Sequence, residues 1–417
     1  MKILQINNCH YRRGGADAVY LNTAELLVSM GDEVVFFSAA AKENDSTINS
    51  RYFVQKIDFL ELSTSAKILK TPRYLYSRES GKKLQELLTI EKPDIAHIHL
   101  YKGDLTVSIL KVLKSNRIPT VITLHDYSLL CPRNILLDGE NKICENCITG
   151  SPLNCLIKRC NRMSFALSAV NTVEYIFNNY LFKPELYFDK IIAPSKFLFN
   201  KHLLKSNLNS RLVHLYNFSP IVKDATQNPV KGKYFLYYGR ISQEKGLHTL
   251  VKTWINLPKT YILKIVGTGP VLSEIEDVIM HNNLDNVELV GYKSGEELND
   301  LVRNCSYVLV PSEWYENNPM TVIECYSYGK PVIVSDIGGL PEIVINRKTG
   351  YTFTMGDQDD LHSKLVKANS LSNEEYKAQS DEARAFALQN FSEKVHYENL
   401  SKIYMDTIMN YKNQPDE

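Results

Sequence analysis

The sequence predicts an α/β protein built from two doubly wound parallel-sheet domains that face each other across a deep cleft. Three observations predict this fold. Short apolar runs alternate with helical patterns along the chain, as in βαβ units. A polar segment with two prolines, 219–233, separates this alternation into two series and suggests an interdomain linker. The 417 residues, 44% of them hydrophobic, are enough for two cores.

The first series extends from the N-terminus to the polar segment. Its strands are predicted at 2–7, 33–38, 94–100, 120–124, 190–195 and 212–217. The clearest helix extends from about Ala16 to Met30, and Gly31 is a suitable residue to end it. We expect this series to form an N-terminal domain over residues 1–218.

The second series follows the polar segment. Its strands are predicted at 234–239, 261–267, 286–291, 307–311, 331–335 and 351–354. Its helices are predicted to begin near Lys245, Val271, Gly295, Pro319 and Gln358. We expect a C-terminal domain over 219–391. Residues 374–411 read as helical, with a break at Phe391 and an N-cap at Ser392.

Composition excludes several classes of protein. No window of 18 apolar residues appears, so no membrane-spanning helix is expected. The first residues begin a strand and lack the apolar region of a signal peptide, so secretion is not expected. The net charge of +1 hides an asymmetry of +8 over residues 1–220 and −7 over 221–417. This indicates either an anionic partner of the basic half or a simple difference between domains.

Two turns in the second series have features of phosphate sites. The segment 239–246 follows a strand and opens a helix, which places Arg240 and Lys245 beside a helix N-terminus, with Gly239 at the strand end. The turn 267–270 repeats this pattern, and Gly269 lets backbone N–H groups approach an anion. Either fragment alone would also suit a solvated surface.

The strongest pattern is Ser312 to Glu324, directly after the strand 307–311. Pro319 is expected at the first position of a helix, so Glu316 lies in the preceding loop and Glu324 inside the helix. Glu316 can then reach the reacting end of a ligand, and Glu324 can accept hydrogen bonds from a diol. The donor-binding loop comprises Asn317, Asn318 and Pro319, followed by Met320 and Thr321, whose N–H groups are expected to face a phosphate.

The segment 312–344, SEWYENNPMTVIECYSYGKPVIVSDIGGLPEIV, resembles the donor-site signature of retaining glycosyltransferases of family 4, also known as glycosyl transferases group 1. The family's two glutamates, separated by seven residues, are matched by Glu316 and Glu324. Its diphosphate-binding Arg and Lys are matched by Arg240 and Lys245. Further landmarks are matched by 338–342 and 349–350, so the resemblance covers nearly the whole chain.

This resemblance implies the GT-B fold, with two Rossmann-like domains and a last helix, from about 392 to 417, that packs back on the first domain. It implies that the N-terminal domain holds the acceptor and the C-terminal domain the nucleotide sugar. Glu316 is then expected to contact the donor sugar and Glu324 the ribose hydroxyls, while Arg240 and Lys245 neutralise the leaving diphosphate. Tyr292 is expected to flank the base. The implied front-face attack needs no cofactor and no metal ion.

The N-terminal domain supplies further candidates. Gly14 and Gly15 open the first helix, without a dinucleotide G-x-G-x-x-G pattern, and resemble the family's loop over the diphosphate. A tight strand-to-helix turn is the simpler alternative. His125 follows the strand 120–124, and by resemblance meets the donor sugar as a catalytic residue, although a lone histidine is more often structural. His99 is a secondary candidate, and His97 lies on the same strand face.

Five of the eight cysteines fall within residues 131–160. Cys144 and Cys147 have the spacing of a zinc knuckle, and Cys155 and Cys160 would complete four ligands, with Cys131 as a substitute. A structural zinc site and inert buried thiols both remain open, whereas disulfides are disfavoured in a cytosolic chain.

Basic residues alternate with aromatic ones over 156–205, and residues 67–83 add Lys67, Lys70, Arg73, Arg78, Lys82 and Lys83. This mixture suits an anionic bilayer surface, and no nucleic-acid motif accompanies it. Solvated lysines over core aromatics are the alternative. The residues concerned are Lys158, Arg159, Arg162, Phe165, Tyr175, Phe177, Tyr180, Phe182, Lys183, Phe197, Lys201 and Lys205.

Together these features predict a retaining transferase that moves a hexosyl unit from a nucleotide sugar such as a UDP-sugar to a glycan or lipid-linked acceptor. The resemblance implies synthesis of a bacterial surface polysaccharide, such as lipopolysaccharide O-antigen, capsule or exopolysaccharide. We expect a cytoplasmic, peripheral protein on the inner face of the plasma membrane. A sugar-nucleotide epimerase and a non-catalytic donor-binding subunit are the alternatives.

Overall fold

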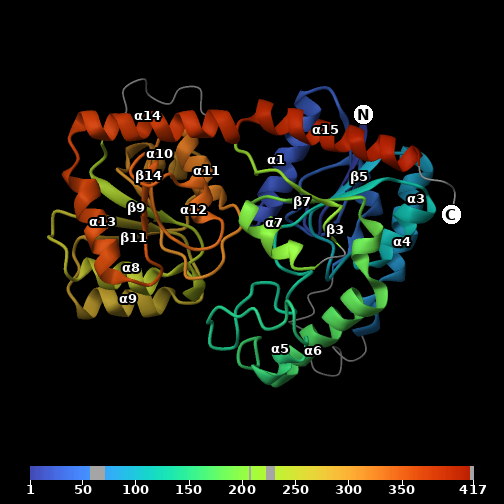
Figure 1. Cartoon of the computed structure of the whole chain (residues 1–417), viewed down its shortest axis with the longest axis horizontal. Coiled ribbons are helices and arrows are strands. Elements are labelled where there is room, and N and C mark those ends of the chain that lie inside the picture. The colour runs from blue at the N-terminus through green and yellow to red at the C-terminus, as the bar shows by residue number, and fades with distance from the viewer. Residues whose placement is uncertain (57–70, 206–207, 222–230, 414–417) are drawn as a thin grey trace.

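The computed structural model describes residues 1–56, 71–205, 208–221 and 231–413. It consists of two α/β units, each built on a six-stranded parallel sheet with helices on both faces (Figure 1). All twelve predicted strands are present. The predicted fold class is therefore confirmed.

The first sheet has the strand order β2-β1-β5-β6-β7-β8. The register places Ile6 at the carboxyl end of β1 beside Phe37 and Ile98. Its strands are β1 (Lys2–Ile6), β2 (Glu33–Phe37), β5 (Ile95–Ile98), β6 (Thr120–Thr123), β7 (Lys190–Ala193) and β8 (Leu212–His214). Its helices are α1 (Gly15–Ser29), α3 (Arg78–Glu91), α4 (Ser108–Ser115), α5 (Asn154–Ile157), α6 (Phe165–Ile176) and α7 (Lys196–Leu203), with the short elements β3 (Ala39–Ala40), β4 (Val54–Gln55), η1 (Ile48–Tyr52), η3 (Phe177–Phe182) and η4 (Pro184–Tyr187).

The second sheet has the order β11-β10-β9-β12-β13-β14. Its strands are β9 (Tyr234–Tyr238), β10 (Ile262–Val266), β11 (Val287–Gly291), β12 (Val308–Val310), β13 (Val332–Ser335) and β14 (Gly350–Phe353). Its helices are α8 (Leu247–Trp254), α9 (Leu272–His281), α10 (Gly295–Asn304), α11 (Met320–Ser327), α12 (Leu340–Ile343), α13 (Gln358–Ser370) and α14 (Asn373–Asn390), with the one-turn helix η6 (Gln243–Lys245).

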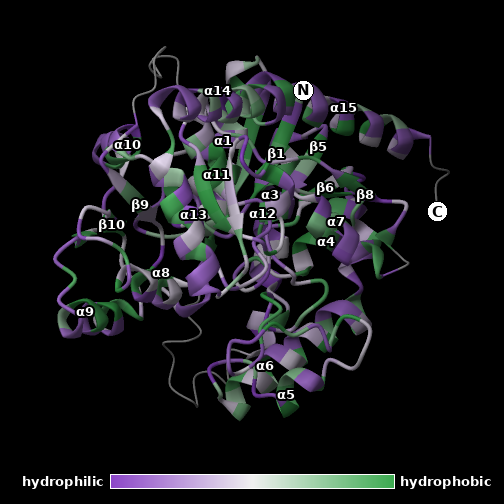
Figure 2. Ribbon diagram, turned by 60° about the vertical axis from the view of Figure 1, so that its left-hand side comes forward, coloured by the Kyte–Doolittle hydropathy of each residue, from purple (hydrophilic) through white to green (hydrophobic). Residues whose placement is uncertain are grey.

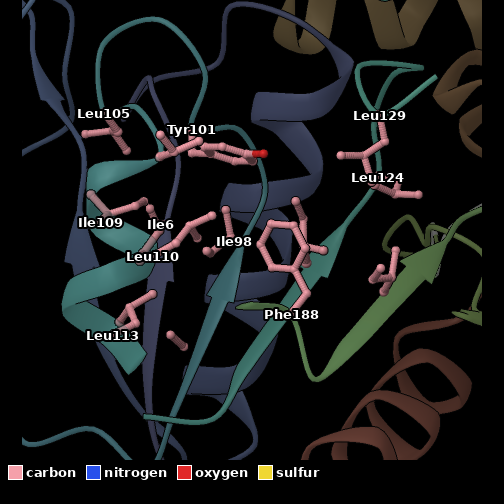
Figure 3. Packing of buried hydrophobic residues seen from close by; sticks show 14 of the residues in the cluster. Ile6, Ile98, Tyr101, Leu105, Ile109, Leu110, Leu113, Leu124, Leu129 and Phe188 are labelled. Atoms are coloured by element: carbon pink, nitrogen blue, oxygen red, sulfur yellow. The ribbon is translucent and has the colours of Figure 1, made fainter. Parts of the chain in front are cut away.

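Each sheet is buried on both faces, which explains why its strands read as continuous apolar runs. In the first unit, Ile6 and Ile98 pack under the α4 side chains Ile109, Leu110 and Leu113 (Figure 3). The hydropathy pattern shows the same division, with apolar strands inside and helices that are polar on their outer faces (Figure 2).

The last two helices, α14 and α15 (Glu393–Lys412), lie one after the other across the two units. α14 lies over the second unit and α15 continues across the first (Figure 1). Ser392 separates the two helices as predicted, because its hydroxyl accepts a hydrogen bond from Val395 N–H. Leu400 and Tyr404 of α15 pack in one buried cluster with Ile3 of β1. Among the described residues, no helix is long and apolar enough to cross a bilayer.

Candidate functional site

Glu316 lies in the loop between β12 and α11, and its carboxylate is buried. One oxygen, Oε1, accepts hydrogen bonds from Lys245 Nζ and from Ser312 Oγ, each at 2.6 Å. Burial alone would raise the pKa of Glu316, but the charge and hydrogen bond of Lys245 hold it below the ordinary value. Glu316 is therefore an anion at neutral pH, and it can accept a hydrogen bond but cannot supply a proton.

Lys245 ends the one-turn helix η6, directly before Gly246 and α8. Its ammonium lies 5.1 Å from the centre of the Trp314 ring, in addition to its ion pair with Glu316. Gly246 is required here, because it has a φ of +71° and a Cβ would lie 1.8 Å from the carbonyl oxygen of Pro311. This close approach joins the β9 turn to the β12 loop and brings Lys245 to Glu316.

The other predicted residues of this region lie in the turns after β9 and β10, which are neighbouring strands of the second sheet. Arg240 is exposed, two residues beyond the end of β9, and its carbonyl accepts the Tyr237 hydroxyl at 2.7 Å. Gly239 directly follows β9, and Gly269 packs against the backbone of Ile241. The turns after β9 and β10 are therefore held together by their backbones.

Glu324 lies on α11, where burial raises the pKa of its carboxyl group. The Tyr238 hydroxyl donates to its Oε2 at 3.1 Å and lies at the same distance from the carbonyl oxygen of Thr321. Tyr238 is the last residue of β9, so Glu324 and Gly239 flank the same strand end.

The N-termini of α1 and α11 meet beside these carboxylates. A Cβ on Gly15 would lie 4.0 Å from the Met320 side chain. Neither helix has a side-chain cap, so its first N–H groups remain available to an anion. The prediction for Pro319 is wrong by one position: it is the N-cap of α11, because its ψ of 118° is extended while its carbonyl already accepts from Val322 N–H.

The loop after Glu316 also connects the two units. Asn317 donates its amide to the carbonyl of His125 at 2.8 Å, and the backbone N–H of Asn217 donates to Asn318 at the same distance. Gly339 fits against this loop, because a Cβ would lie 1.8 Å from the carbonyl oxygen of Asn317. The loop geometry is thus fixed from both sides.

His125 follows β6 and belongs to a buried chain of polar groups. Its Nε2 lies 2.9 Å from Nδ1 of His99, whose Nε2 lies 3.1 Å from Oε1 of Gln5. Burial lowers the pKa of His125 to about 4, so the imidazole is neutral at physiological pH. The His97 ring lies against that of His99, with ring centres 4.3 Å apart, and its nitrogens pair with Tyr404 of α15 and with Thr123.

Two features lie apart from these groups. Tyr292 extends from the edge strand β11 and is 69% exposed. A cavity of about 870 Å³ lies at the amino ends of β6 and β7, beside Thr120 and Lys190, on the sheet edge opposite to His125. None of the residues that line this cavity belongs to the candidate site described above.

The zinc prediction is not supported. Cys147, Cys155 and Cys160 pack together as a buried apolar cluster, whereas Cys144 is half-buried with its sulfur 3.5 Å from Lys158 Nζ. Cys131 belongs to the core of the first unit. Within the described ranges, no group of three or more His, Cys, Asp or Glu side chains is arranged to hold a metal ion.

The residues predicted for a membrane surface fall into two groups. Lys67 and Lys70 lie outside the described residues. Tyr175 is buried, and Phe177, Phe182 and Phe197 pack against the core. Lys201 is paired with Glu145, and the half-buried Lys205 donates to the Leu129 carbonyl. These partly or fully buried side chains have structural contacts. The exposed members of the 156–205 set are Lys158, Arg159, Arg162, Phe165, Tyr180 and Lys183.

Residues 13–218 match the model of Glycosyltransferase Family 4, and residues 219–386 match that of Glycosyl transferases group 1. The chain belongs to glycosyltransferase family 4. This family of retaining transferases uses nucleotide sugars, and the chain has its GT-B fold.

Relatives of this family 4 chain match it in part. The uncharacterized glycosyltransferase MJ1178 of Methanocaldococcus jannaschii is 33% identical over 187 residues, which are 45% of this chain and 51% of that protein. The amylovoran biosynthesis glycosyltransferase AmsK of Erwinia amylovora is 24% identical over 172 residues, 39% of this chain and 42% of that protein. The match thus spans about half the length of these two relatives. The crystal structure of Anabaena HepE in complex with UDP and glucose has a TM-score of 0.64 at 16% identity, covering 96% of this chain and 98% of that one.

Several residues that support the candidate site were not predicted from the sequence. Tyr238 could have been found as a polar residue at the end of a strand, and Ser312 as a hydroxyl four residues before Glu316. Glu145, which accepts the Tyr315 hydroxyl at 2.6 Å, had no such signal because it lies in the cysteine-rich loop.

Proposed function

We propose that this chain transfers a hexosyl unit, with retention, from a nucleotide-diphosphate sugar to a glycan or lipid-linked acceptor. The observation that carries the proposal is the Lys245–Glu316 pair, which lies where the β9 turn, the β12 loop and two uncapped helix N-termini converge. A diphosphate matches the cations and N–H groups, and a sugar matches the carboxylate.

Each group of residues has a separate role in the proposed reaction. Arg240, Lys245 and the N–H groups of Gly15, Met320 and Thr321 stabilise the negative charge that develops on the leaving diphosphate. Glu316, ionised and fixed by Ser312, accepts hydroxyl hydrogen bonds from the donor sugar. Glu324, held by Tyr238, accepts from the ribose diol.

The N-terminal domain, 1–218, provides the acceptor side. His125 contacts the donor sugar as a neutral hydrogen-bonding group rather than as a cation, since burial lowers its pKa to about 4. Gly14 precedes α1 with open space around its Cα, which leaves room for a ligand at the helix N-terminus. Arg240 and Lys245 supply the positive charge, so we propose that catalysis requires no metal ion or cofactor.

Two relatives support a polysaccharide pathway and a UDP donor: one is named for amylovoran biosynthesis, and HepE was solved with UDP and glucose. We therefore propose UDP-hexose as the first donor to test and a surface polysaccharide as the product. The proposed place of the reaction is the cytoplasmic face of the plasma membrane.

Acceptor-dependent release of nucleotide tests this function. The purified chain is incubated with UDP-glucose, UDP-galactose or GDP-mannose, with and without an alkyl glycoside acceptor. We expect UDP release that requires the acceptor and falls at least a hundredfold in Glu316→Gln. Conversion of the donor without acceptor and without nucleotide release would instead indicate an epimerase, and binding without any turnover would indicate a donor-binding subunit.

A further inference from the structure

Residues 151–187, called here the α5–α6 lobe, project from the first unit on the side away from α15 (Figures 1 and 2). The lobe contains α5, α6, η3 and η4, with a turn at 158–163 between the first two. It carries eight of the 23 large apolar side chains that are exposed among the described residues. Such density on so short a segment is unusual for a surface in contact with water only.

The apolar residues are strongly exposed. Ile157 at the end of α5 is 76% exposed, Phe165 at the start of α6 is 59% exposed, and Leu181 in η3 is 73% exposed. The remaining members of the set are Leu153, Met163, Val173, Tyr180 and Leu186. Polar residues alternate with apolar ones along α5 and α6 (Figure 2).

Every exposed charged residue of the lobe is basic: Lys158, Arg159, Arg162 and Lys183. Its two acidic residues point inward, since Glu185 is buried and Glu174 accepts a hydrogen bond from Tyr74 at 3.2 Å. The lobe thus presents aliphatic and aromatic groups together with positive charge and no exposed carboxylate.

We propose that the α5–α6 lobe binds the surface of an anionic lipid bilayer, with its apolar side chains in the interface and its basic side chains on lipid phosphates. Large apolar groups interleaved with lysine and arginine suit this occupant. A nucleic acid would use the charges but leave Ile157 and Leu181 without a partner.

The position of the lobe connects this surface to the candidate site. The loop before it reaches the second unit, because Glu145 accepts the Tyr315 hydroxyl and Asn141 donates to Gln243, each at 2.6 Å. A bilayer against the lobe would therefore hold a lipid-linked acceptor near the site. That last step rests on the proposed function, whereas binding of the lobe to lipid does not.

Vesicle cosedimentation of the full chain, without donor or acceptor, tests the proposal. Vesicles of pure phosphatidylcholine are compared with vesicles that contain about one third phosphatidylglycerol. The charge variant is Arg159→Glu with Arg162→Glu, and its matched control is Lys348→Glu with Lys367→Glu, two exposed lysines of the second unit. The apolar variant is Ile157→Ser with Leu181→Ser, and its control is Ile48→Ser with Met280→Ser, which are 86% and 64% exposed.

We expect the wild type to bind the anionic vesicles and to bind the neutral ones weakly. At about fivefold per basic residue, the charge variant should lose at least about 25-fold in vesicle affinity, and the apolar variant should lose about tenfold, while both controls bind as the wild type does. Equal binding to both vesicle types, no binding by the folded wild type, or equal losses in the controls would overturn the proposal. So would a dimer in lipid-free solution that the apolar variant dissociates, because the lobe would then be a self-association surface.

Discussion

Replacing Lys245 by methionine removes the charge that is paired with Glu316 among the described residues, and it nearly keeps the length of the side chain. Glu316 Oε1 lies 2.6 Å from Lys245 Nζ, and the side chains are 26% and 7% exposed. After the change the carboxylate retains Ser312 as a hydrogen-bond donor but has lost its countercharge.

Leaving one partner of a buried ion pair unpaired costs about 3–5 kcal/mol in stability. Because Lys245 is about a quarter exposed, solvent screening should reduce this loss to roughly 2–3 kcal/mol, which corresponds to a fall in Tm of about 5–10 °C. The loss of a charge-assisted hydrogen bond to the diphosphate, worth about 1.5–3 kcal/mol, should weaken donor binding by roughly 10- to 150-fold.

A double-mutant cycle separates these effects. Lys245→Met, Glu316→Gln and the double variant are compared by thermal unfolding and by calorimetric titration with UDP, with Lys252→Met on the exposed face of α8 as control. We expect the double variant to recover at least half of the stability lost in Lys245→Met, because an amide needs no countercharge, but none of the donor affinity. Additive losses of stability, or unchanged UDP affinity in Lys245→Met, would refute the reasoning.

Three further predictions concern the candidate site, and a fourth concerns Glu342 of α12, whose half-buried carboxyl group accepts hydrogen bonds from the backbone N–H groups of Lys196 and Phe197. Glu324→Gln should weaken nucleotide-sugar binding about tenfold by calorimetry with little change in Tm, and unchanged affinity would remove Glu324 from the ribose position. Since burial lowers the pKa of His125 to about 4, turnover should show no inflection from this imidazole between pH 5 and 8; an inflection that disappears in His125→Asn would contradict this. Burial raises the pKa of Glu342 to about 7, so the contribution of its protonated form to stability is complete below the ordinary pKa of a glutamate and is lost as pH rises through 7. Glu342→Gln should therefore flatten this part of a plot of Tm against pH. An identical slope in the variant and the wild type would contradict this prediction. Treatment with EDTA should leave turnover unchanged, and a loss restored by Mg²⁺ would contradict metal-independent catalysis.

Much of the fold could be predicted because parallel strands that are buried on both faces appear in the sequence as continuous apolar runs. The run 331–335 and the strand β13 (Val332–Ser335) differ by one residue, and both Gly31 and Ser392 mark real helix ends. Pro319 was misplaced by one position because its fixed φ suits both an N-cap and a first helical residue, and only ψ distinguishes them.

The sequence indicates candidate residues for the site but not how they pair. Lys245 and Glu316 are 71 residues apart, and nothing in their local sequence shows that one oxygen of Glu316 binds both Lys245 and Ser312. Their contact depends on Gly246 packing against Pro311, a tertiary feature. Spacing alone also could not distinguish a zinc site from inert buried thiols, because the positions of the cysteines depend on the fold, which packs Cys147, Cys155 and Cys160 together and places Cys144 beside Lys158.

The most direct test of the account is calorimetric titration of UDP- and GDP-sugars into the metal-free wild type, Arg240→Gln and Lys245→Met. We expect one class of nucleotide sugar to bind the wild type selectively and each variant to lose at least tenfold in affinity. No binding across the panel, or equal affinity in all three proteins, would contradict the assignment of the donor diphosphate to Arg240 and Lys245.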